Sequence, residues 1–413
     1  MNLSPIVLYV QIAHGFSVEF RTFERITRFA GSAITPHILY NAYDSTLDET
    51  PRFDALATRQ GAPCAIHPLD FGWRLLEPRQ SVWNRYTNRA RFAVAALASA
   101  VRMARGINPD VVVSSQQHWD CYVATVIAKR LRIPHILHLH YTVGDYLRPT
   151  VLKRLRTADQ IITVSEFIRG EALRHGVAPD KVRAILNTVD PVVPPPPGTR
   201  ERLRRELGVP EGGFLLGNIS RLDPQKGQAD ILTAFTTVLK QFPETRLALV
   251  GSETPWHPGY QRMLETLART LGVAEQTVFT GFRRDVPELL AAMDVFLHPS
   301  RHEPFGQATA EASQAGLPVV AYAEGGTQEV VTHSETGLLP PPESGAFGLA
   351  DAIATLLSDR AMRESFGRAG RERMANAPFA PVSGAEAFVE TVCKVIGRQA
   401  FGAPRPAARK VTP

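Results

Sequence analysis

The chain has 413 residues, of which 44% are hydrophobic and 21% charged. It is therefore long enough for two or three soluble domains, and its composition excludes a disordered chain, a fibrous repeat and a membrane bundle. Its three cysteines are too few and too widely spaced for a disulfide framework or a thiolate zinc site, which favours a reducing compartment. The net charge of +6 is uneven, because residues 1–200 carry 24 Lys and Arg against 16 Asp and Glu, whereas residues 201–413 carry 22 against 24.

The first half of the chain alternates short apolar runs with longer amphipathic stretches. Helices are predicted over residues 17–29, 79–105 and 122–131. Strands are predicted at residues 6–10, 37–40, 64–68, 111–114, 136–140, 161–164 and 182–186. Short apolar strands separated by helices are typical of a parallel sheet that is covered on both faces. We therefore predict an α/β domain over residues 1–190.

The proline-rich segment 191–198 can neither enter a helix nor donate ladder hydrogen bonds, and it is the predicted linker. The alternation then resumes, with helices predicted at 228–241 and 260–271 and strands at 215–219, 247–250, 277–280, 295–298, 319–321 and 337–339. A second α/β domain over residues 199–382 follows from this pattern. The Pro-, Ala- and Arg-containing tail 402–413 is predicted to be disordered.

Ligands bind outside the carboxyl ends of parallel strands, so site residues are expected to follow strands and to line a cleft between two such domains. Arg221 and Lys226 follow the strand at 215–219 and can converge on one anion. The alternative is a pair of solvated surface charges. The segment is not a phosphate-binding P-loop, because G-x-x-x-x-G-K-[ST] is absent.

The strongest motif follows the strand at 295–298. Pro304 suits the start of a helix, and a helix that begins near residues 305–307 would direct free backbone N–H groups at an anion. Glu303 and Glu311 are eight residues apart, which separates them by about 12 Å along a helix axis. That spacing is too long for two carboxylates flanking one bond. It suits an extended ligand such as a nucleoside diphosphate sugar, and the alternative is two helix-surface glutamates.

Paired glycines at 325 and 326 follow the next strand and are expected to let backbone approach a ligand, unless they form a plain turn. In the first half, His138 and His140 lie on one face of a strand end. An H-x-H pair can bind metal, but further ligands are not evident, so His140 is better interpreted as a hydrogen-bond partner or acid–base group. The residues His14, Gly15, His118 and Tyr141 are expected to line the cleft.

Several absent motifs exclude other functions. No G-x-G-x-x-G follows a strand and no G-x-S-x-G occurs, which argues against a nicotinamide dehydrogenase and an α/β-hydrolase. No D-x-D is present to hold a metal–diphosphate complex, so we predict no metal and no cofactor. Phosphate charge would then be neutralised by Arg221, Lys226 and the helix N-terminus. No motif for nucleic-acid recognition accompanies the basic residues.

At these residues the chain resembles the retaining glycosyltransferases of family 4, which have the two-domain GT-B fold. The segments that carry the resemblance are S-R-L-D-P-Q-K-G at 220–227, G-F-R-R-D-V-P-E-L-L-A-A-M-D-V at 281–295, H-P-S-R-H-E-P-F-G-Q-A-T-A-E-A at 298–312, G-L-P-V-V-A-Y-A-E-G-G-T-Q-E-V-V at 316–331, G-L-L at 337–339, A-D-Q-I-I-T-V-S-E-F at 158–167 and I-L-N-T-V-D at 185–190. Two loops depart from the family pattern: Ala13-His14-Gly15 replaces a glycine pair, and Gly251-Ser252-Glu253-Thr254 replaces a glycine-rich turn.

The resemblance implies two doubly wound, Rossmann-like domains and a role for each motif. Arg221 and Lys226 would hold the donor diphosphate, and Glu311 the ribose. Glu303 would contact the transferred sugar, with the amides of residues 305–307 (Phe305, Gly306 and Gln307) around the sugar and phosphate. The segment Gly281, Phe282 and Arg283 would lie against the base. His140 would approach the sugar from the first domain, and a helix near 383–398 would cross back to that domain.

The sequence therefore predicts transfer of a sugar from a UDP- or GDP-sugar to a hydroxyl acceptor, in the synthesis of a polysaccharide, glycolipid or other glycoconjugate. The acceptor is a sugar, a lipid-linked acceptor or a small molecule. One alternative is an epimerase of nucleotide sugars with the same fold, which needs no acceptor. Another is a non-catalytic subunit that binds a sugar nucleotide.

The basic excess lies on the half that the resemblance assigns to the acceptor. Arginines flank the apolar run 92–101, at positions 79, 85, 89, 91, 102 and 105, with Trp83 and Tyr86 nearby. This combination suits an anionic membrane surface or an acidic lipid-linked acceptor. The alternative is a solvated helix that packs through its alanine-rich face. We expect a cytoplasmic protein, peripheral at the inner face of the plasma membrane if the first interpretation holds.

Overall fold

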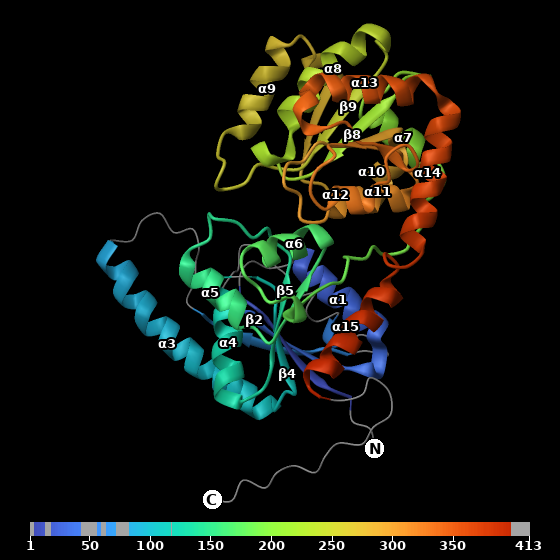
Figure 1. Cartoon of the computed structure of the whole chain (residues 1–413). Coiled ribbons are helices and arrows are strands. Elements are labelled where there is room, and N and C mark those ends of the chain that lie inside the picture. The colour runs from blue at the N-terminus through green and yellow to red at the C-terminus, as the bar shows by residue number, and fades with distance from the viewer. Residues whose placement is uncertain are drawn as a thin grey trace, which may run out of the picture. The chain divides into compact units, whose positions relative to one another are not determined.

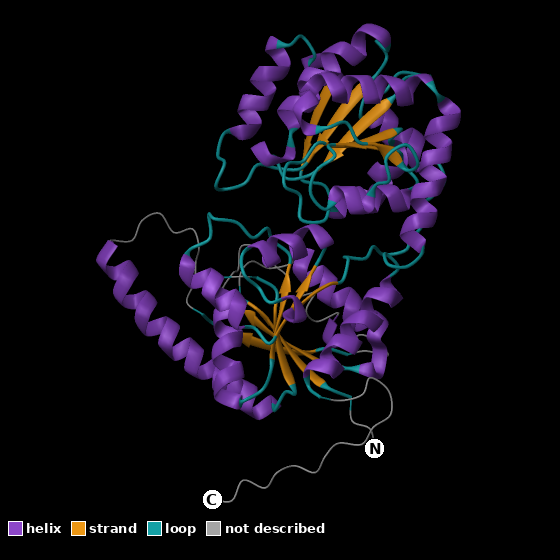
Figure 2. Cartoon of the chain, in the orientation of Figure 1, coloured by secondary structure: helices purple, strands orange, loops and turns teal. Residues whose placement is uncertain are grey.

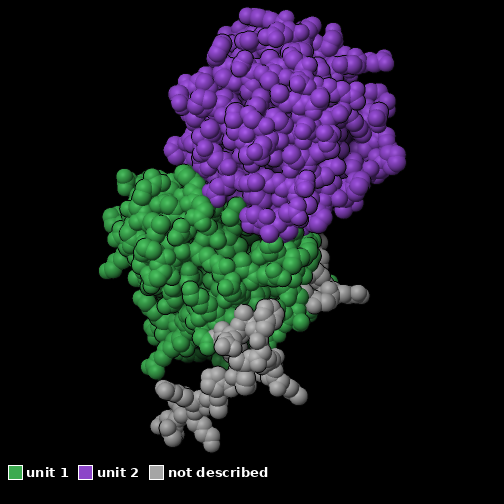
Figure 3. Space-filling view, turned by 45° about the vertical axis from the view of Figure 1, so that its right-hand side comes forward, with its two compact units in different colours: residues 1–186, 381–413 green, residues 187–380 purple. Residues whose placement is uncertain are grey.

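The computed structural model of the chain describes residues 4–12, 18–42, 56–58, 63–71, 82–116 and 118–397, and of residues 82–93 only the backbone. Helices surround a central sheet in each of two regions (Figures 1 and 2). The chain divides into two compact units, unit 1 with residues 1–186 and 381–413 and unit 2 with residues 187–380 (Figure 3). Each unit is an α/β domain with a parallel sheet, which confirms the predicted fold class. His14, Gly15 and the tail 402–413 lie outside the described residues.

Seven strands of the described part of unit 1 form one parallel sheet in the order β3-β2-β1-β4-β5-β6-β7. The strands are β1 (Ile6–Gln11), β2 (Thr35–Asn41), β3 (Ala65–Leu69), β4 (Val111–Ser114), β5 (His135–Leu139), β6 (Gln160–Thr163) and β7 (Val182–Ala184). The helices are α1 (Val18–Ala30), α3 (Val82–Ile107), α4 (Trp119–Leu131), α5 (Pro149–Thr157), α6 (Glu166–Arg174) and α15 (Pro381–Val395).

The central strand β1 shows why this sheet needs a layer of helices on each face. Successive side chains of a strand point to opposite faces. Val7 and Tyr9 pack in a core with residues of α1 and α15, whereas Leu8 and Val10 pack in a core with residues of α3 and α4. All four side chains are fully buried. The C-terminal helix α15 is thus part of unit 1, where it packs against α1.

The described part of the basic helix α3 packs through its alanines. Ala96, Ala100 and Ala104 are buried in the core, whereas Arg102 and Arg105 are exposed. This packing matches the alternative interpretation, a solvated helix that packs through its alanine-rich face. The basic residues Arg102 and Arg105 remain on the outward side of the helix. Arg79 lies outside the described residues, as do the side chains of the other arginines up to residue 91. Among the described helices, none combines the length and the apolar character needed to cross a membrane.

Unit 2 contains a second parallel sheet, whose six described strands have the order β10-β9-β8-β11-β12-β13. The strands are β8 (Leu215–Ile219), β9 (Arg246–Val250), β10 (Thr277–Gly281), β11 (Val295–His298), β12 (Val319–Ala321) and β13 (Gly337–Leu338). The helices are α7 (Thr199–Glu206), α8 (Gln228–Gln241), α9 (Tyr260–Thr270), α10 (Val286–Ala292), α11 (Gln307–Ala315), α12 (Thr327–Val330), α13 (Gly345–Ser358) and α14 (Arg360–Ala375). Segment 191–198 contains no helix or strand.

Candidate active site

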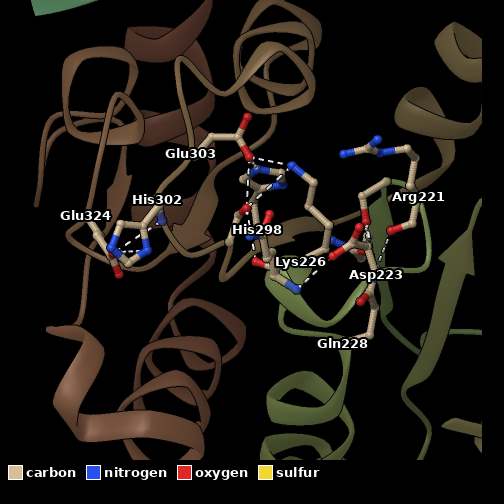
Figure 4. A network of polar contacts seen from close by, with 12 residues as sticks. Arg221, Asp223, Lys226, Gln228, His298, His302, Glu303 and Glu324 are labelled. Carbon is tan, nitrogen blue, oxygen red and sulfur yellow. Dashed lines mark hydrogen bonds and ion pairs between the residues drawn. The ribbon is translucent and has the colours of Figure 1, made fainter. Parts of the chain in front are cut away.

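The carboxylate of Glu303 lies at the centre of a polar cluster in unit 2 (Figure 4). Its Oε2 atom is 2.6 Å from Nζ of Lys226. The same oxygen accepts a hydrogen bond of 2.8 Å from Oγ of Ser300 and lies 3.2 Å from Nε2 of His298. The Lys226, Glu303 and His298 side chains are 16%, 11% and 3% exposed, so this ion pair lies in a largely desolvated environment.

Glu303 is ionised at neutral pH. Burial by itself raises the pKa of this carboxyl, but the Lys226 ammonium and the hydrogen bond from His298 outweigh burial and hold the pKa well below its usual range. An ionised carboxylate can accept hydrogen bonds and stabilise positive charge, but it has no proton to donate. His298 donates from Nε2, and its Nδ1 atom is buried without a hydrogen-bond partner.

The cluster forms because two neighbouring strands end at the same edge of the sheet. β8 pairs with β11 through Leu216–Val295 and Gly217–Phe296, so the loops that follow these strands meet. The amide of Arg301 donates to the carbonyl of Gln225 at 2.8 Å. This backbone contact holds the loop after β8, which contains Lys226, against the loop after β11, which contains Glu303.

The glycine pair Gly325–Gly326 packs closely against the backbone of the loop that contains Glu303. The amide of Gly326 donates to the carbonyl of Glu303 at 2.8 Å. A Cβ atom on Gly325 would lie 2.5 Å from the same carbonyl oxygen, and one on Gly326 would lie 2.4 Å from the carbonyl oxygen of Pro304. Glycine is required at both positions because two backbone segments come too close for any side chain.

We expect Gly325→Ala to reduce activity strongly, because the new Cβ displaces the backbone of Glu303 and moves its carboxylate from Lys226. Gly212→Ala is the matched control. Both residues have positive φ angles, +63° and +75°, but a Cβ on Gly212 would meet nothing within 4 Å. Both variants carry the backbone strain, and only Gly325→Ala adds the clash. Turnover and thermal unfolding of both variants measure the difference, and equal activity losses would contradict the packing role.

Helix α11 begins at Gln307 after Gly306, which confirms the helix start predicted near residues 305–307. Its first turn contains two buried side-chain oxygens that make no hydrogen bond, Oε1 of Gln307 and Oγ1 of Thr309. Oγ1 of Thr327, at the start of α12, is also buried without a hydrogen bond. A helix N-terminus with such groups suits an anionic or hydroxyl-rich ligand. Glu311 lies in the second turn, half-buried, and accepts a hydrogen bond of 3.2 Å from Gln307.

Phe305 lies beside this helix start with its ring in the core. The side chain is 2% exposed, and its ring centroid is 6.4 Å from that of Phe379. The ring of Phe305 is therefore part of the core and is not available to a ligand.

Arg221 and Lys226 both lie in the loop that follows β8, and in Figure 4 their charged ends point to the same side. Lys226 is paired with Glu303. Arg221 is exposed and has no carboxylate within ion-pair distance among the residues that the structure describes. Its guanidinium lies over the ring of Trp256, with 5.9 Å from Cζ to the centroid. The Arg221 charge is thus available to an anion, whereas that of Lys226 is shared with Glu303.

The segment after β10 contains an exposed aromatic ring, that of Phe282, and a guanidinium that is paired with carboxylates, that of Arg283. Gly281 ends the strand and Phe282 is 69% exposed. The guanidinium of Arg283 pairs with Asp285 and with Glu206, each at 2.6 Å, and these hydrogen bonds raise its pKa further. Arg283 is held within unit 2 by these carboxylates, which leaves Phe282 and the backbone to face a ligand.

In unit 1, His140 directly follows β5, and its ring lies 4.3 Å from that of His138, which confirms that both side chains share a face. Both nitrogens of His140 are buried without partners. Burial lowers the pKa of His140 to about 3, so the imidazole is neutral at pH 7. A neutral imidazole can donate one hydrogen bond and accept another.

Two other predicted residues of unit 1 lie at the ends of neighbouring strands. Tyr141 is 40% exposed, and Gln116 donates to its hydroxyl at 3.4 Å. His118 is exposed and directly precedes α4. Desolvation, followed by the charges of Arg154 and Arg148, lowers the pKa of His118. Within the described ranges no three His, Cys, Asp or Glu side chains are grouped to hold a metal ion.

Sequence reasoning assigned no role to His298 and Ser300, although both lie inside the strongest motif. Their hydrogen bonds orient the Glu303 carboxylate. The spacing His298-x-Ser300-x-x-Glu303 after a buried strand could have indicated this contact. A tight loop after a strand end can fold back, which brings the carboxylate of Glu303 next to His298 and Ser300.

Family models match both halves of the chain. Residues 26–193 match the family described as Glycosyltransferase Family 4, and residues 199–373 match Glycosyl transferases group 1. The chain is 30% identical over 304 residues to the 2-deoxystreptamine glucosyltransferase of Streptomyces kanamyceticus, covering 68% of this chain and 77% of that enzyme. It is 33% identical over 245 residues to a GDP-mannose-dependent alpha-(1-6)-phosphatidylinositol monomannoside mannosyltransferase of Mycobacterium tuberculosis, covering 54% and 59%.

A solved structure is similar over nearly the whole chain. Anabaena HepE in complex with UDP and glucose superposes with a TM-score of 0.77 at 23% identity, covering 94% of this chain and 100% of HepE. At this level of identity the similarity shows the fold, which is the GT-B arrangement of two parallel-sheet domains.

Proposed function

Because the chain belongs to the glycosyltransferases of group 1 and family 4, we propose that it transfers a sugar from a nucleoside diphosphate sugar to a hydroxyl acceptor with retention at the anomeric carbon. The donor is bound by unit 2. The observation that supports this most directly is the Glu303 cluster beside the N-terminus of α11. It combines an ionised carboxylate, a paired lysine and unpartnered polar groups within one strand-exit region.

The chemistry of the cluster suits a cationic sugar and an anionic leaving group. Lys226 and Arg221 bring positive charge to the diphosphate as its bond to the anomeric carbon breaks. The ionised Glu303 stabilises positive charge on the sugar and accepts hydrogen bonds from its hydroxyls. Its interaction with Lys226 makes it a weak nucleophile, so it positions the sugar rather than attacking it. The departing phosphate oxygen takes the acceptor proton, and the acceptor oxygen bonds to the anomeric carbon.

Unit 1 is the proposed acceptor domain, with His140 as a neutral hydrogen-bonding group and His118 and Tyr141 as acceptor contacts. The two named relatives act on different acceptors, one on 2-deoxystreptamine and the other on a phosphatidylinositol mannoside. Both a small hydroxyl compound and a lipid-linked sugar are therefore consistent with the family. We expect donor binding to survive His140→Ala while transfer is lost.

Peripheral association with the inner face of the plasma membrane is a further part of the proposal. The exposed Arg102 and Arg105 lie on the outward face of α3, and residues 1–200 carry the basic excess. Co-sedimentation with anionic vesicles at low salt is the measurement, and absence from the pellet would remove this part alone.

The proposed function is tested by screening UDP-, GDP- and ADP-sugars for thermal stabilisation, since a bound donor stabilises the fold by mass action. The donor that stabilises most is then incubated with and without hydroxyl acceptors, and the anomeric configuration of the product is read by NMR. Glu303→Gln is expected to abolish transfer, with Glu372→Gln, an exposed residue of α14, as the control. Conversion of UDP-N-acetylglucosamine to an epimer without acceptor would favour an epimerase, and tight binding without turnover a non-catalytic subunit.

A further inference from the structure

The loop that follows β9, residues 251–259, exposes a tryptophan beside the proposed phosphate-binding arginine. Trp256 is 56% exposed, and its ring lies under the guanidinium of Arg221. This is the loop that replaces the glycine-rich turn of the family. Phe282, which is 69% exposed, follows the neighbouring strand β10, so adjacent strand exits carry two exposed aromatic rings.

The backbone of this loop is held in place on both sides. The amide of Gly251 donates to the carbonyl of Gly281 at 2.9 Å, and the amide of Leu222 donates to the carbonyl of Ser252 at 2.9 Å. Within the loop, the carboxylate of Glu253 accepts from the amides of Gly259 and Gln261 at 3.0 and 3.1 Å. Trp256 is therefore presented from a braced loop between the exits of β8 and β10.

The order of the strands arranges the candidate donor groups in a row. From β11 to β10, neighbouring strand exits carry Glu303, then Arg221 and Lys226, then Trp256, and finally Phe282. Adjacent strands are about 4.8 Å apart, so three spacings span about 14 Å. An extended nucleoside diphosphate sugar presents its groups in the same order, with the sugar first, the diphosphate in the middle and the base last.

We propose that Trp256 is a stacking surface for the nucleobase of the donor, with Phe282 as a second aromatic contact from the neighbouring loop. The inference rests on the proposed function. A nucleobase offers a flat π-face that stacks on an aromatic ring whatever its hydrogen-bonding edges. Stacking on one part of the indole is compatible with the Arg221 contact, which keeps the guanidinium beside the diphosphate. Trp256 thus contributes to affinity for the nucleoside part and not for the phosphates.

The test measures binding of UDP, GDP, ADP and inorganic pyrophosphate by titration calorimetry to the full chain and to Trp256→Ala, Trp256→Phe and Phe347→Ala. Phe347 is the matched control, because it is an aromatic residue of unit 2, 81% exposed on α13. We expect Trp256→Ala to raise the Kd of the tightest nucleotide by about tenfold or more and to leave pyrophosphate binding unchanged. Trp256→Phe and Phe347→Ala retain nucleotide affinity.

Two results would overturn the inference while the proposed function stands: unchanged nucleotide affinity in Trp256→Ala, or equal losses for nucleotide and pyrophosphate, which would mean that Trp256 only orients Arg221. If Trp256→Ala does not fold, the decisive measurement is indole fluorescence. Nucleotide quenches it in the unaltered chain, and persistence of that quenching in Trp256→Phe would overturn the inference. Absence of any nucleotide binding by the unaltered chain would overturn the proposed function and this inference together.

Discussion

Lys226→Ala is expected to reduce sugar transfer by about 10³-fold, the loss typical of removing one preorganised group from a charge-stabilising site. The lysine has two tasks in the proposed mechanism. It brings positive charge to the departing diphosphate, and at 2.6 Å it keeps the buried Glu303 carboxylate ionised. Without it, burial again raises the pKa of Glu303. The acidic limb of the pH–rate profile of the residual activity should therefore move to higher pH.

Donor affinity and turnover are measured separately for this variant, because the two tasks affect them differently. Loss of phosphate contacts weakens donor binding, whereas loss of Glu303 ionisation lowers the maximal rate. Lys240→Ala is the control, since Lys240 is an exposed lysine of α8 in the same unit. The double variant Lys226→Met, Glu303→Gln removes the unpaired buried charge, so it should unfold at a higher temperature than Lys226→Ala and still be inactive. Normal turnover by Lys226→Ala would contradict the assignment.

Unit 1 is expected to lose stability as the pH falls from 7 to 5. Six of its histidines have lowered pKa values, with burial as the first cause in each: His37, His67, His118, His135, His138 and His140. The unfolded chain takes up protons at these positions from about pH 6.5, while the folded unit takes them up only at lower pH. The stability present above pH 6.5 is therefore lost progressively below it.

The expected loss is large because the most buried of these groups have large shifts. The pKa of His135 is lowered to about 4, which at pH 5 costs on the order of 2 kcal/mol of unfolding free energy for this residue alone. In unit 2, the lowered pKa of Glu303 acts in the same direction, but only below the usual glutamate pKa of about 4.3.

Hydrogen exchange at pH 7 and pH 5, corrected for the intrinsic rates, resolves the two units. Amides of unit 1 should lose protection first. His135→Gln is the matched variant, because an amide can keep the 2.8 Å hydrogen bond with Ser114 but does not titrate in this range. Its unfolding temperature should fall less between pH 7 and pH 5 than that of the unaltered chain. Earlier loss of protection in unit 2 would contradict the prediction.

Much of the candidate site in unit 2 was predictable because its signals are local. The buried strand before residue 298 and Pro304 with Gly306 ahead of a helical run are properties of adjacent residues, and α11 begins within the predicted range. The same holds for His138 and His140, whose shared face follows from the alternation along one strand. In each case the backbone geometry of a few residues sufficed.

Long-range partners were not predictable from such signals. Arg283 is held by Glu206, 77 residues away in the chain, and the sequence offered no sign of that pairing. The glycine pair at 325 and 326 packs closely against the backbone of Glu303 and Pro304, a contact that its composition did not reveal. The alanine-rich face of α3 was compatible with both interpretations until the described alanines were located in the core.

The sequence by itself determined the two α/β domains, the strand exits on which the site is built and the residue types that suit a nucleoside diphosphate sugar. Hydrophobic periodicity, proline and glycine restrict the conformation of a few neighbouring residues, whatever the rest of the fold. Only the tertiary structure decided which charges meet. It placed Lys226, His298 and Ser300 on one oxygen of Glu303 and Trp256 on Arg221. Ionisation and charge stabilisation depend on distances between side chains and on burial, which exist only after the strands have paired.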